Sequence, residues 1–372
     1  MTAVPEARGG AGRKLLLLAL GVCLGIVAAE GILRAAGVRP YPIWSPRDLH
    51  VADPELGLMP APSFACREES AEYSVAIRTN SLGLRSPEPP ADPGFVVFVL
   101  GDSFAFGRGV EQEETAPARL QRILDAARGS AGRPITVLNL GVESYGTWQS
   151  LRRFDRIAPR IAPDLCVLLF FAGNDVLDNV RPALTVREGF VVREGEAVPM
   201  WRRLWLWLKF HSASYRAIAD ALPATGIPGR CSDHTSFGFD LFRRAPTAEV
   251  ESGWRSTEEA LRALRASTER AGCRLVVACI PTRFQVDPEL WRRDREECGF
   301  AEEDFDLERV SARLSSACAA LEVPCLDLLP AFRRAQGPLY FHGELEMHLD
   351  AEGQRVLAQT LAEFLASEDL LK

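Results

Sequence analysis

The hydrophobic positions of this 372-residue chain form short, continuous apolar runs separated by longer amphipathic stretches. Each run has the length of a strand, and its unbroken hydrophobicity is typical of strands that are buried on both faces of a parallel sheet. The pattern therefore predicts five strands, at residues 95–100, 135–140, 165–171, 274–280 and 323–328.

Amphipathic stretches with helical spacing alternate with these runs. They lie at residues 113–127, 147–161, 257–271, 307–321 and 352–366. Alternating strands and helices indicate a parallel sheet that is covered by helices on both faces. We expect a three-layer α/β/α sandwich with a five-stranded sheet, flavodoxin-like in its broad arrangement.

The alternation is interrupted between about residues 178 and 254, which predicts an insertion. Within it, Trp201, Leu204, Trp205 and Leu208 share one helical face, and basic residues lie nearby, at Arg202, Arg203 and Lys209. Packing of this face on the core is the commoner role of such a stripe. Contact with a membrane surface or with the active site is the alternative.

The N-terminus carries an apolar segment. Arg13 and Lys14 precede an uncharged run at residues 15–29, which ends at Glu30. We expect residues 1–36 to be an uncleaved transmembrane anchor, with the N-terminus in the cytoplasm and the remaining chain exported. A signal peptide cleaved after Ala29 is the alternative.

Residues 37–79 are assigned to a stalk and linker, because residues 38–62 are rich in proline and polar side chains. Residues 80–372 are assigned to the folded domain.

Composition narrows the possible partners. The net charge is −7 and no dense Lys/Arg stripe is present, which argues against nucleic-acid binding. The nine cysteines show no metal-ligand spacing, so neither a metal nor another cofactor is expected. Six cysteines could form disulfides in an oxidising compartment, and their pairing stays open: Cys66, Cys231, Cys273, Cys298, Cys318 and Cys325.

Four short segments carry candidate chemistry. Ser103 follows the first predicted strand, so its hydroxyl lies at the carboxyl end of the sheet, where α/β folds place their sites. Gly141 and Asn174 follow the next two strands and offer an N–H group and a side-chain amide to an oxyanion. His348, just before the last helix, is the candidate general base.

At these residues the chain resembles the SGNH subgroup of the GDSL hydrolases, from about Asn80 to its end. The resemblance implies that Ser103 is the nucleophile and His348 the base. It also implies that Gly141, Asn174 and the Ser103 N–H form the oxyanion hole. Gly146 is the alternative to Gly141. The segments at residues 80–85 and 173–179 look like those of the membrane-anchored bacterial members.

One position departs from the family pattern. The family usually carries Asp two or three residues before the histidine, whereas this chain has Leu345 and Glu346. We assign Glu346 as the residue that orients His348. Glu344 or a backbone carbonyl is the alternative, and His342 is the rival base.

The resemblance implies a serine esterase. An exported, membrane-tethered domain would face envelope carbohydrate, so ester-linked acyl groups, especially acetyl groups, are the expected substrates. An O-acyltransferase or a lipid esterase would use the same residues. An inactive, membrane-tethered protein for glycan binding or assembly is the alternative outside the enzymes. The oligomeric state stays open.

Overall fold

The computed structural model describes residues 10–38, 40, 48–70, 72–128, 133–187, 189–221, 238–341 and 347–371. The chain divides into two compact units. Unit 1 contains Met1–Trp44 and Ala197–Ile227, and unit 2 contains Ser45–Glu196 and Pro228–Lys372. Each unit is described separately.

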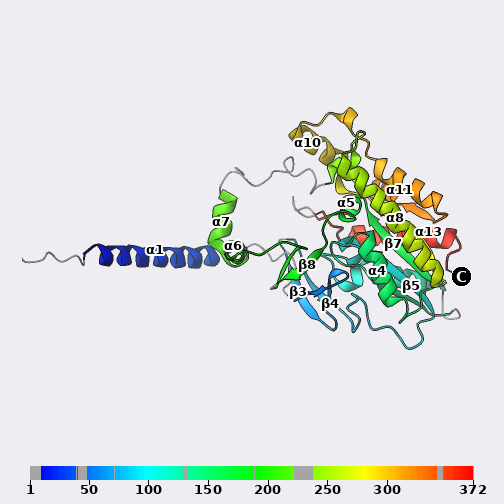
Figure 1. Ribbon diagram of the computed structural model, residues 1–372, viewed down its shortest axis with the longest axis horizontal. Coiled ribbons are helices and arrows are strands. Elements are labelled where there is room, and N and C mark those ends of the chain that lie inside the picture. Colours follow the sequence, from blue (N-terminus) through cyan, green and yellow to red (C-terminus); the bar gives the residue numbers. More distant parts are fainter. Residues whose placement is uncertain are drawn as a thin grey trace, which may run out of the picture. The chain divides into compact units, whose positions relative to one another are not determined.

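A five-stranded parallel sheet forms the centre of unit 2 (Figure 1). Its strands are β5 (Phe95–Gly101), β6 (Ile135–Asn139), β7 (Leu165–Phe171), β10 (Arg274–Ile280) and β11 (Cys325–Asp327). Their spatial order is β11-β10-β7-β5-β6. Counted along the chain, this is the 2-1-3-4-5 order of flavodoxin-like folds. The five predicted strands and the predicted arrangement are confirmed.

The sheet separates two layers of apolar side chains. In β7, Cys166, Leu168 and Phe170 pack into one layer. The residues between them pack into the other layer, as expected from the two-residue period of a strand. The first layer is covered by α4 (Thr147–Ile157), α8 (Ala248–Arg270) and α11 (Arg309–Ala320), and the second by α3 (Ala116–Arg128), α12 (Leu329–Arg334) and α13 (Ala351–Ser367).

The five predicted helices correspond to α3, α4, α8, α11 and α13. The largest difference is at α8, which begins at Ala248 rather than near residue 257. The Thr247 hydroxyl caps this helix by accepting from the Val250 N–H at 3.3 Å, and Trp254 is buried in the added turns. Unit 2 also contains short helices: α2 (Ser103–Phe106), α5 (Asp175–Asp178), α9 (Arg283–Val286), α10 (Pro288–Cys298), and the 3-10 helices η1 (Gln112–Glu114), η2 (Phe239–Phe242) and η3 (Glu302–Asp304).

The segment expected to be a stalk is largely folded. Unit 2 contains two hairpins here, made of β1 (His50–Asp53) with β2 (Gly57–Pro60) and of β3 (Ala65–Glu69) with β4 (Ser74–Arg78). Leu58 and Ile77 are buried in them. Apolar residues at alternate positions of these short strands provide the anchoring, a pattern that the surrounding prolines obscured.

The predicted insertion is divided between the two units. Its first part forms the hairpin of β8 (Leu184–Arg187) and β9 (Phe190–Arg193) in unit 2. The segment Ala197–Ile227 belongs to unit 1, where it forms α6 (Met200–His211) and α7 (Ala213–Ala221).

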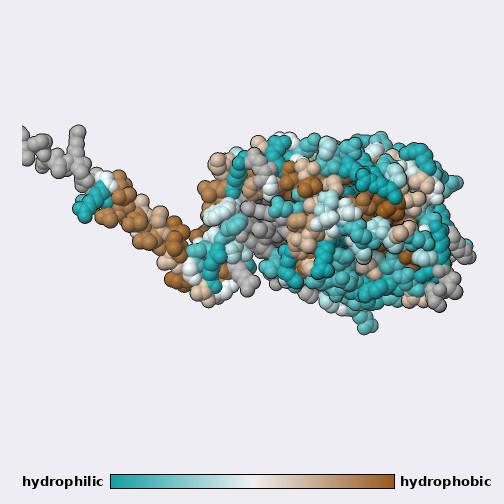
Figure 2. Space-filling model, turned by 90° about the horizontal axis from the view of Figure 1, so that it is seen from below, coloured by the Kyte–Doolittle hydropathy of each residue, from teal (hydrophilic) through white to brown (hydrophobic). Residues whose placement is uncertain are grey.

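Unit 1 also contains α1 (Gly10–Ala35). Its stretch Gly12–Ala35 has a mean hydropathy of 2.4 and is not buried by the protein, and Figure 2 shows hydrophobic residues along it. By length and composition this helix could cross a membrane, and a signal sequence would have the same properties.

The apolar face of α6 is exposed within unit 1. Trp201 is 69% exposed and Leu204 is 57% exposed, so unit 1 provides no core for this face, and its packing on the core of the folded domain stays a prediction. The amphipathic pattern was correct, but it did not reveal that this helix leaves unit 2.

Candidate active site

Ser103 lies two residues beyond the end of β5, a strand in the interior of the sheet. Strand β5 ends at Gly101, where φ is +142° and a Cβ atom would lie 2.5 Å from the Leu169 carbonyl oxygen, so a residue with a side chain is excluded. The next residue, Asp102, caps α2 by accepting from the Phe104 N–H at 2.9 Å. Ser103 is therefore the first residue of a helix, and its N–H belongs to the group that lacks an intrahelical acceptor.

The end of α2 is held by a buried arginine that sequence reasoning missed. The Arg85 guanidinium donates to the carbonyl oxygens of Phe106 (3.1 Å), Gly107 (2.6 Å) and Val110 (2.6 Å). Burial lowers its pKa to about 10, so the group stays charged at neutral pH. A single side chain thus satisfies the carbonyl groups that follow the nucleophile's helix.

His348 reaches Ser103 from the other end of the chain. Its Nε2 atom lies 2.7 Å from the Ser103 Oγ atom, a hydrogen-bonding distance. The His348 ring is mostly buried, and its centroid lies 5.1 Å from that of Phe104. Phe104 in turn stacks on Phe171 with 3.9 Å between centroids. The structure therefore brings together the two residues expected to be nucleophile and base.

The third position of the predicted triad lies outside the described residues. This applies to Glu346, to its alternative Glu344 and to the rival base His342. The assignment of Glu346 stays a prediction.

Asn174 lies just beyond the end of another strand of the sheet. It follows β7 and precedes α5, and its Nδ2 atom donates to the Asp178 carboxylate. The Asn174 side chain also hydrogen-bonds to the Asp102 carboxyl, an interaction that acts to lower the pKa of Asp102.

The Gly141 N–H, predicted as an oxyanion donor, already has an acceptor within the protein. It donates to the Asn139 side chain at 2.9 Å. A Cβ atom at this position would lie 2.4 Å from the Phe106 nitrogen. Glycine is thus required here because the loop after β6 packs directly against α2.

Gly146, the alternative oxyanion donor, does not lie in the loop position of Gly141 but directly before a helix. It precedes α4, and its N–H donates to the Gln149 side chain at a longer distance of 3.2 Å. A Cβ atom on it would lie 3.2 Å from the Asp178 carbonyl carbon. Because Asp178 binds the Asn174 amide, Gly146 lies on the Asn174 side of the site.

Buried carboxyl groups surround the nucleophile's turn. Burial and the neighbouring Asp178 charge raise the pKa of Asp102 to about 7, although the Phe104 N–H opposes this shift. Burial, together with the charge of Asp102, raises the pKa of Asp175 well above its ordinary value. One oxygen of Asp175 accepts from the Phe171 N–H at 3.0 Å, whereas the other finds no hydrogen-bond partner among the described residues.

Within the described part of the chain, no group of His, Cys, Asp and Glu side chains could hold a metal ion.

A buried ionic network connects the N-terminal hairpins to the site loops. Arg108, just after α2, lies 3.3 Å from Glu68 of β3 and 3.7 Å from Glu143 of the loop after β6. His50 of β1 lies 3.5 Å from Glu143. Burial lowers the pKa of His50 despite the opposing effect of Glu143, so the imidazole is mainly neutral at pH 7. Sequence reasoning missed this network because its members are far apart along the chain.

A polar pocket of about 850 Å³ is lined in part by Asp178, the residue whose carboxylate accepts from the Asn174 amide. Trp148 contributes an aromatic ring to its wall, and most other side chains in the wall are charged or polar. The lining includes Asp53, Glu55, Gln149, Arg152, Asn179, Arg181, Thr185, Arg187 and Glu194.

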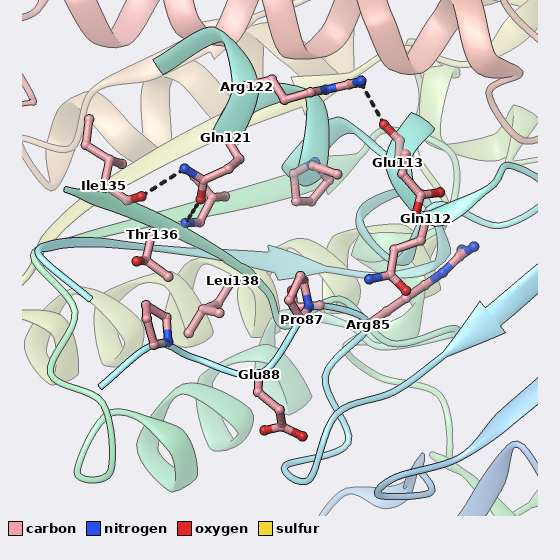
Figure 3. Close-up of a pocket in the computed structure, with 15 residues that line it drawn as sticks. Arg85, Pro87, Glu88, Gln112, Glu113, Gln121, Arg122, Ile135, Thr136 and Leu138 are labelled. Carbon is pink, nitrogen blue, oxygen red and sulfur yellow. Dashed lines mark hydrogen bonds between the residues drawn. The ribbon is translucent and has the colours of Figure 1, made fainter. Parts of the chain in front are cut away.

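A second pocket, of about 450 Å³, lies against the edge strand β6 and α3 (Figure 3). The Gln121 amide donates to the Ile135 carbonyl at 2.8 Å and accepts from the Val137 N–H at 2.7 Å, which closes this edge of the sheet. Arg122 donates to the Glu113 carbonyl at 2.7 Å. In contrast to the polar pocket, whose lining includes Asp178, the lining of this pocket contains no residue of the candidate active site.

Solved structures that match the chain include a lipase/acylhydrolase from Enterococcus faecalis, with 12% identity and a TM-score of 0.41. This match covers 74% of this chain and 96% of that chain. The psychrotrophic esterase EstA from Pseudoalteromonas sp. matches with 12% identity, coverage of 73% and 97%, and a TM-score of 0.39. The acetyl xylan esterase AlAXEase matches with 13% identity, coverage of 74% and 99%, and a TM-score of 0.39.

No curated protein sequence matches the chain. The model of the GDSL-like Lipase/Acylhydrolase family matches residues 99–356, which is more than half of the chain and extends from β5 to α13. The chain therefore belongs to the GDSL-like lipase/acylhydrolase family and is a serine hydrolase.

Proposed function

We propose that this protein is a serine esterase that removes ester-linked acyl groups, chiefly acetyl, from envelope carbohydrate. The observation that carries the proposal is the 2.7 Å distance between Ser103 Oγ and His348 Nε2. A serine hydroxyl within hydrogen-bonding reach of an imidazole is the arrangement that activates a nucleophile for acyl transfer.

The reaction proceeds through an acyl-enzyme. His348 Nε2 accepts the Ser103 proton while Oγ forms a bond to the ester carbonyl carbon. The imidazolium then protonates the alcohol oxygen as the ester C–O bond breaks, which leaves the acyl group on Ser103. A water molecule, deprotonated by His348, attacks this acyl group. The bond between Ser103 Oγ and the acyl carbon then breaks, the acid is released, and the imidazolium returns the proton to Oγ. Glu346 is the proposed group that orients His348 through these steps.

Three donors would stabilise the oxyanion. We assign the Ser103 N–H at the start of α2, the Asn174 side-chain amide, and the Gly146 N–H. Gly146 replaces Gly141 in this assignment because the Gly141 N–H is bound to Asn139 at a shorter distance.

The pocket beside Asp178 favours a polar alcohol over a lipid. Its wall carries the charged side chains Arg152, Arg181 and Arg187, together with Asp53 and Glu55. Desolvation of these groups by an acyl chain would be unfavourable, whereas sugar hydroxyls can hydrogen-bond to them. We therefore place the carbohydrate part of the substrate in this pocket.

The proposed location is the bacterial inner membrane, with unit 2 on the periplasmic side. The apolar helix α1 provides the span, and Arg13 and Lys14 before its apolar run favour a cytoplasmic N-terminus. Cys298 is disulfide-bonded, which accords with an oxidising compartment.

Acetate release from an acetylated polysaccharide tests the function. We expect the full-length protein in detergent to release acetate and to prefer p-nitrophenyl acetate over longer p-nitrophenyl esters. Ser103→Ala should be inactive in both assays. Activity that rises with chain length would contradict the carbohydrate assignment. Transfer of acetyl to an added oligosaccharide in place of acetate release would instead establish an O-acyltransferase.

A further inference from the structure

Helix α6 exposes a concentration of large apolar side chains. Three of the seven tryptophans of the chain lie on it, at Trp201, Trp205 and Trp207. They are 69%, 41% and 52% exposed, and Met200 and Leu204 are exposed beside them. Leaving this much aromatic and aliphatic surface in water is unfavourable by roughly 25 cal/mol per Å².

These side chains form one continuous face of α6. At 100° per residue, the arc from Trp207 through Leu204 to Trp205 is about 160° wide. The cationic residues of α6 lie outside this arc, at Arg202, Arg203 and Lys209. An apolar face rich in tryptophan that is flanked by lysine and arginine is the pattern of a helix lying in a membrane interface.

Two charged residues of α1 connect this helix to the apolar segment. The Glu30 carboxylate accepts from the N–H groups of Ala213 and Ser214, both at 2.9 Å, and thereby caps the start of α7. It also accepts from the Ser212 hydroxyl at 2.9 Å. Arg34 donates to the His211 carbonyl at 2.6 Å, at the end of α6. The junction of α6 and α7 is thus bound to the last turns of α1.

We propose that α6 is an interfacial helix whose apolar face lies in the same lipid bilayer that α1 spans. The inference rests on the proposed membrane anchoring of α1. Because Glu30 and Arg34 follow the apolar run of α1, their contacts hold the α6–α7 junction where that run would emerge from the hydrocarbon. Tryptophan prefers this depth, since its ring is apolar and its N–H remains near water.

The charges of this segment fit a bilayer with anionic headgroups. Residues 200–221 contain the cations Arg202, Arg203, Lys209 and Arg216, against a single acidic residue, Asp220. Basic residues near an anionic surface favour binding to it. The excess of cations is opposite to the net charge of −7 of the whole chain, so it is a local property of this segment.

Lipid-depth quenching of tryptophan emission tests the proposal. The full-length protein would be reconstituted in vesicles of phosphatidylcholine and phosphatidylglycerol, with bromine atoms placed either near the headgroups or near the chain ends. We expect stronger quenching by the bromines near the headgroups. The triple variant Trp201→Phe/Trp205→Phe/Trp207→Phe should lose most of this quenching. The control Trp148→Phe, which alters a half-buried residue of unit 2, should keep it.

Three outcomes would overturn the proposal. Unchanged quenching in the triple variant would show that the α6 tryptophans do not contact lipid. Emission that responds to a serine-directed phosphonate, and not to brominated lipid, would show that α6 covers the active site instead. Release of the full-length protein by alkaline carbonate would overturn the anchoring by α1 as well. That last result is measured separately, so the failure of α6 and the failure of α1 are distinguishable.

Discussion

At the scale of residues, the site combines a reactive pair with an unusual number of buried carboxyl groups. Ser103 and His348 are in hydrogen-bonding contact, and the nucleophile is preceded by Asp102, which is buried. The pair could be predicted from the sequence because each residue lies in a short, recognisable segment. The oxyanion role of Gly141 stays a prediction, and the sequence does not show that Asn139 accepts from the Gly141 N–H.

Replacing Asn174 with alanine tests its proposed contact with the oxyanion. We expect kcat to fall roughly 10²–10³-fold with little change in KM, because the donor acts mainly in the transition state. Steady-state kinetics on p-nitrophenyl acetate would show this. A change confined to KM would assign Asn174 to substrate binding instead.

The raised pKa of Asp102 predicts a pH-dependent stability. In the folded protein this pKa is about 7, against an ordinary value of 3.8, so the folded state binds more protons between about pH 4 and pH 7. Its contribution to the free energy of unfolding therefore declines as pH rises through this window. Asp102→Asn keeps an oxygen that can accept from the Phe104 N–H and removes the titration. Its stability relative to the wild type should increase from pH 4 to pH 7 and then level off.

Urea unfolding at several pH values measures this difference. Asp287→Asn is the matched control, since Asp287 also caps a helix but is only partly buried. A constant difference between Asp102→Asn and the wild type across the whole range would contradict the assignment.

At the scale of elements, the apolar runs predicted the central sheet because a buried parallel strand leaves a continuous hydrophobic run. The two N-terminal hairpins were missed, since their strands have only four or five residues and lie among prolines. Neither Arg85 nor Arg108 could be assigned from the sequence. Their partners are backbone carbonyls and distant acids that only the folded chain brings together.

The short helix α2 depends on Arg85. Arg85→Met would remove four hydrogen bonds to backbone carbonyl groups, three of them at residues 106–110, so we expect a loss of roughly 3 kcal/mol or more in the free energy of unfolding. Arg122→Met is the control, because Arg122 is exposed and donates to one carbonyl. It should cost under about 1 kcal/mol. Urea unfolding of the two variants checks this, and equal losses would contradict the role of Arg85.

At the scale of the whole molecule, the chain passes between its two units three times. Unit 1 contains both the N-terminal segment and the segment Ala197–Ile227. Unit 2 is therefore connected to the unit that contains α1 by more than one stretch of chain. The sequence indicated an insertion at this place, but not that its helices bind the end of α1. That contact depends on Glu30 and Arg34. From the hydrophobic pattern, these two residues indicate only where the apolar run ends.

This arrangement predicts that α1 is retained in the mature protein. Cleavage after Ala29 would separate the apolar run from Glu30, whose carboxylate caps α7. Mass spectrometry of the membrane fraction should find the intact N-terminus with its Arg13 and Lys14. A mature N-terminus at Glu30 would establish a cleaved signal peptide.

The most direct test of the catalytic centre is the site and rate of covalent labelling by a serine-directed phosphonate. Peptide mass mapping should find the adduct on Ser103. Folded His348→Ala should be labelled at least about 100-fold more slowly, because the general base that accepts the serine proton is lost. An adduct on another residue, or an unchanged labelling rate in folded His348→Ala, would contradict the assignment of Ser103 as nucleophile and His348 as its base.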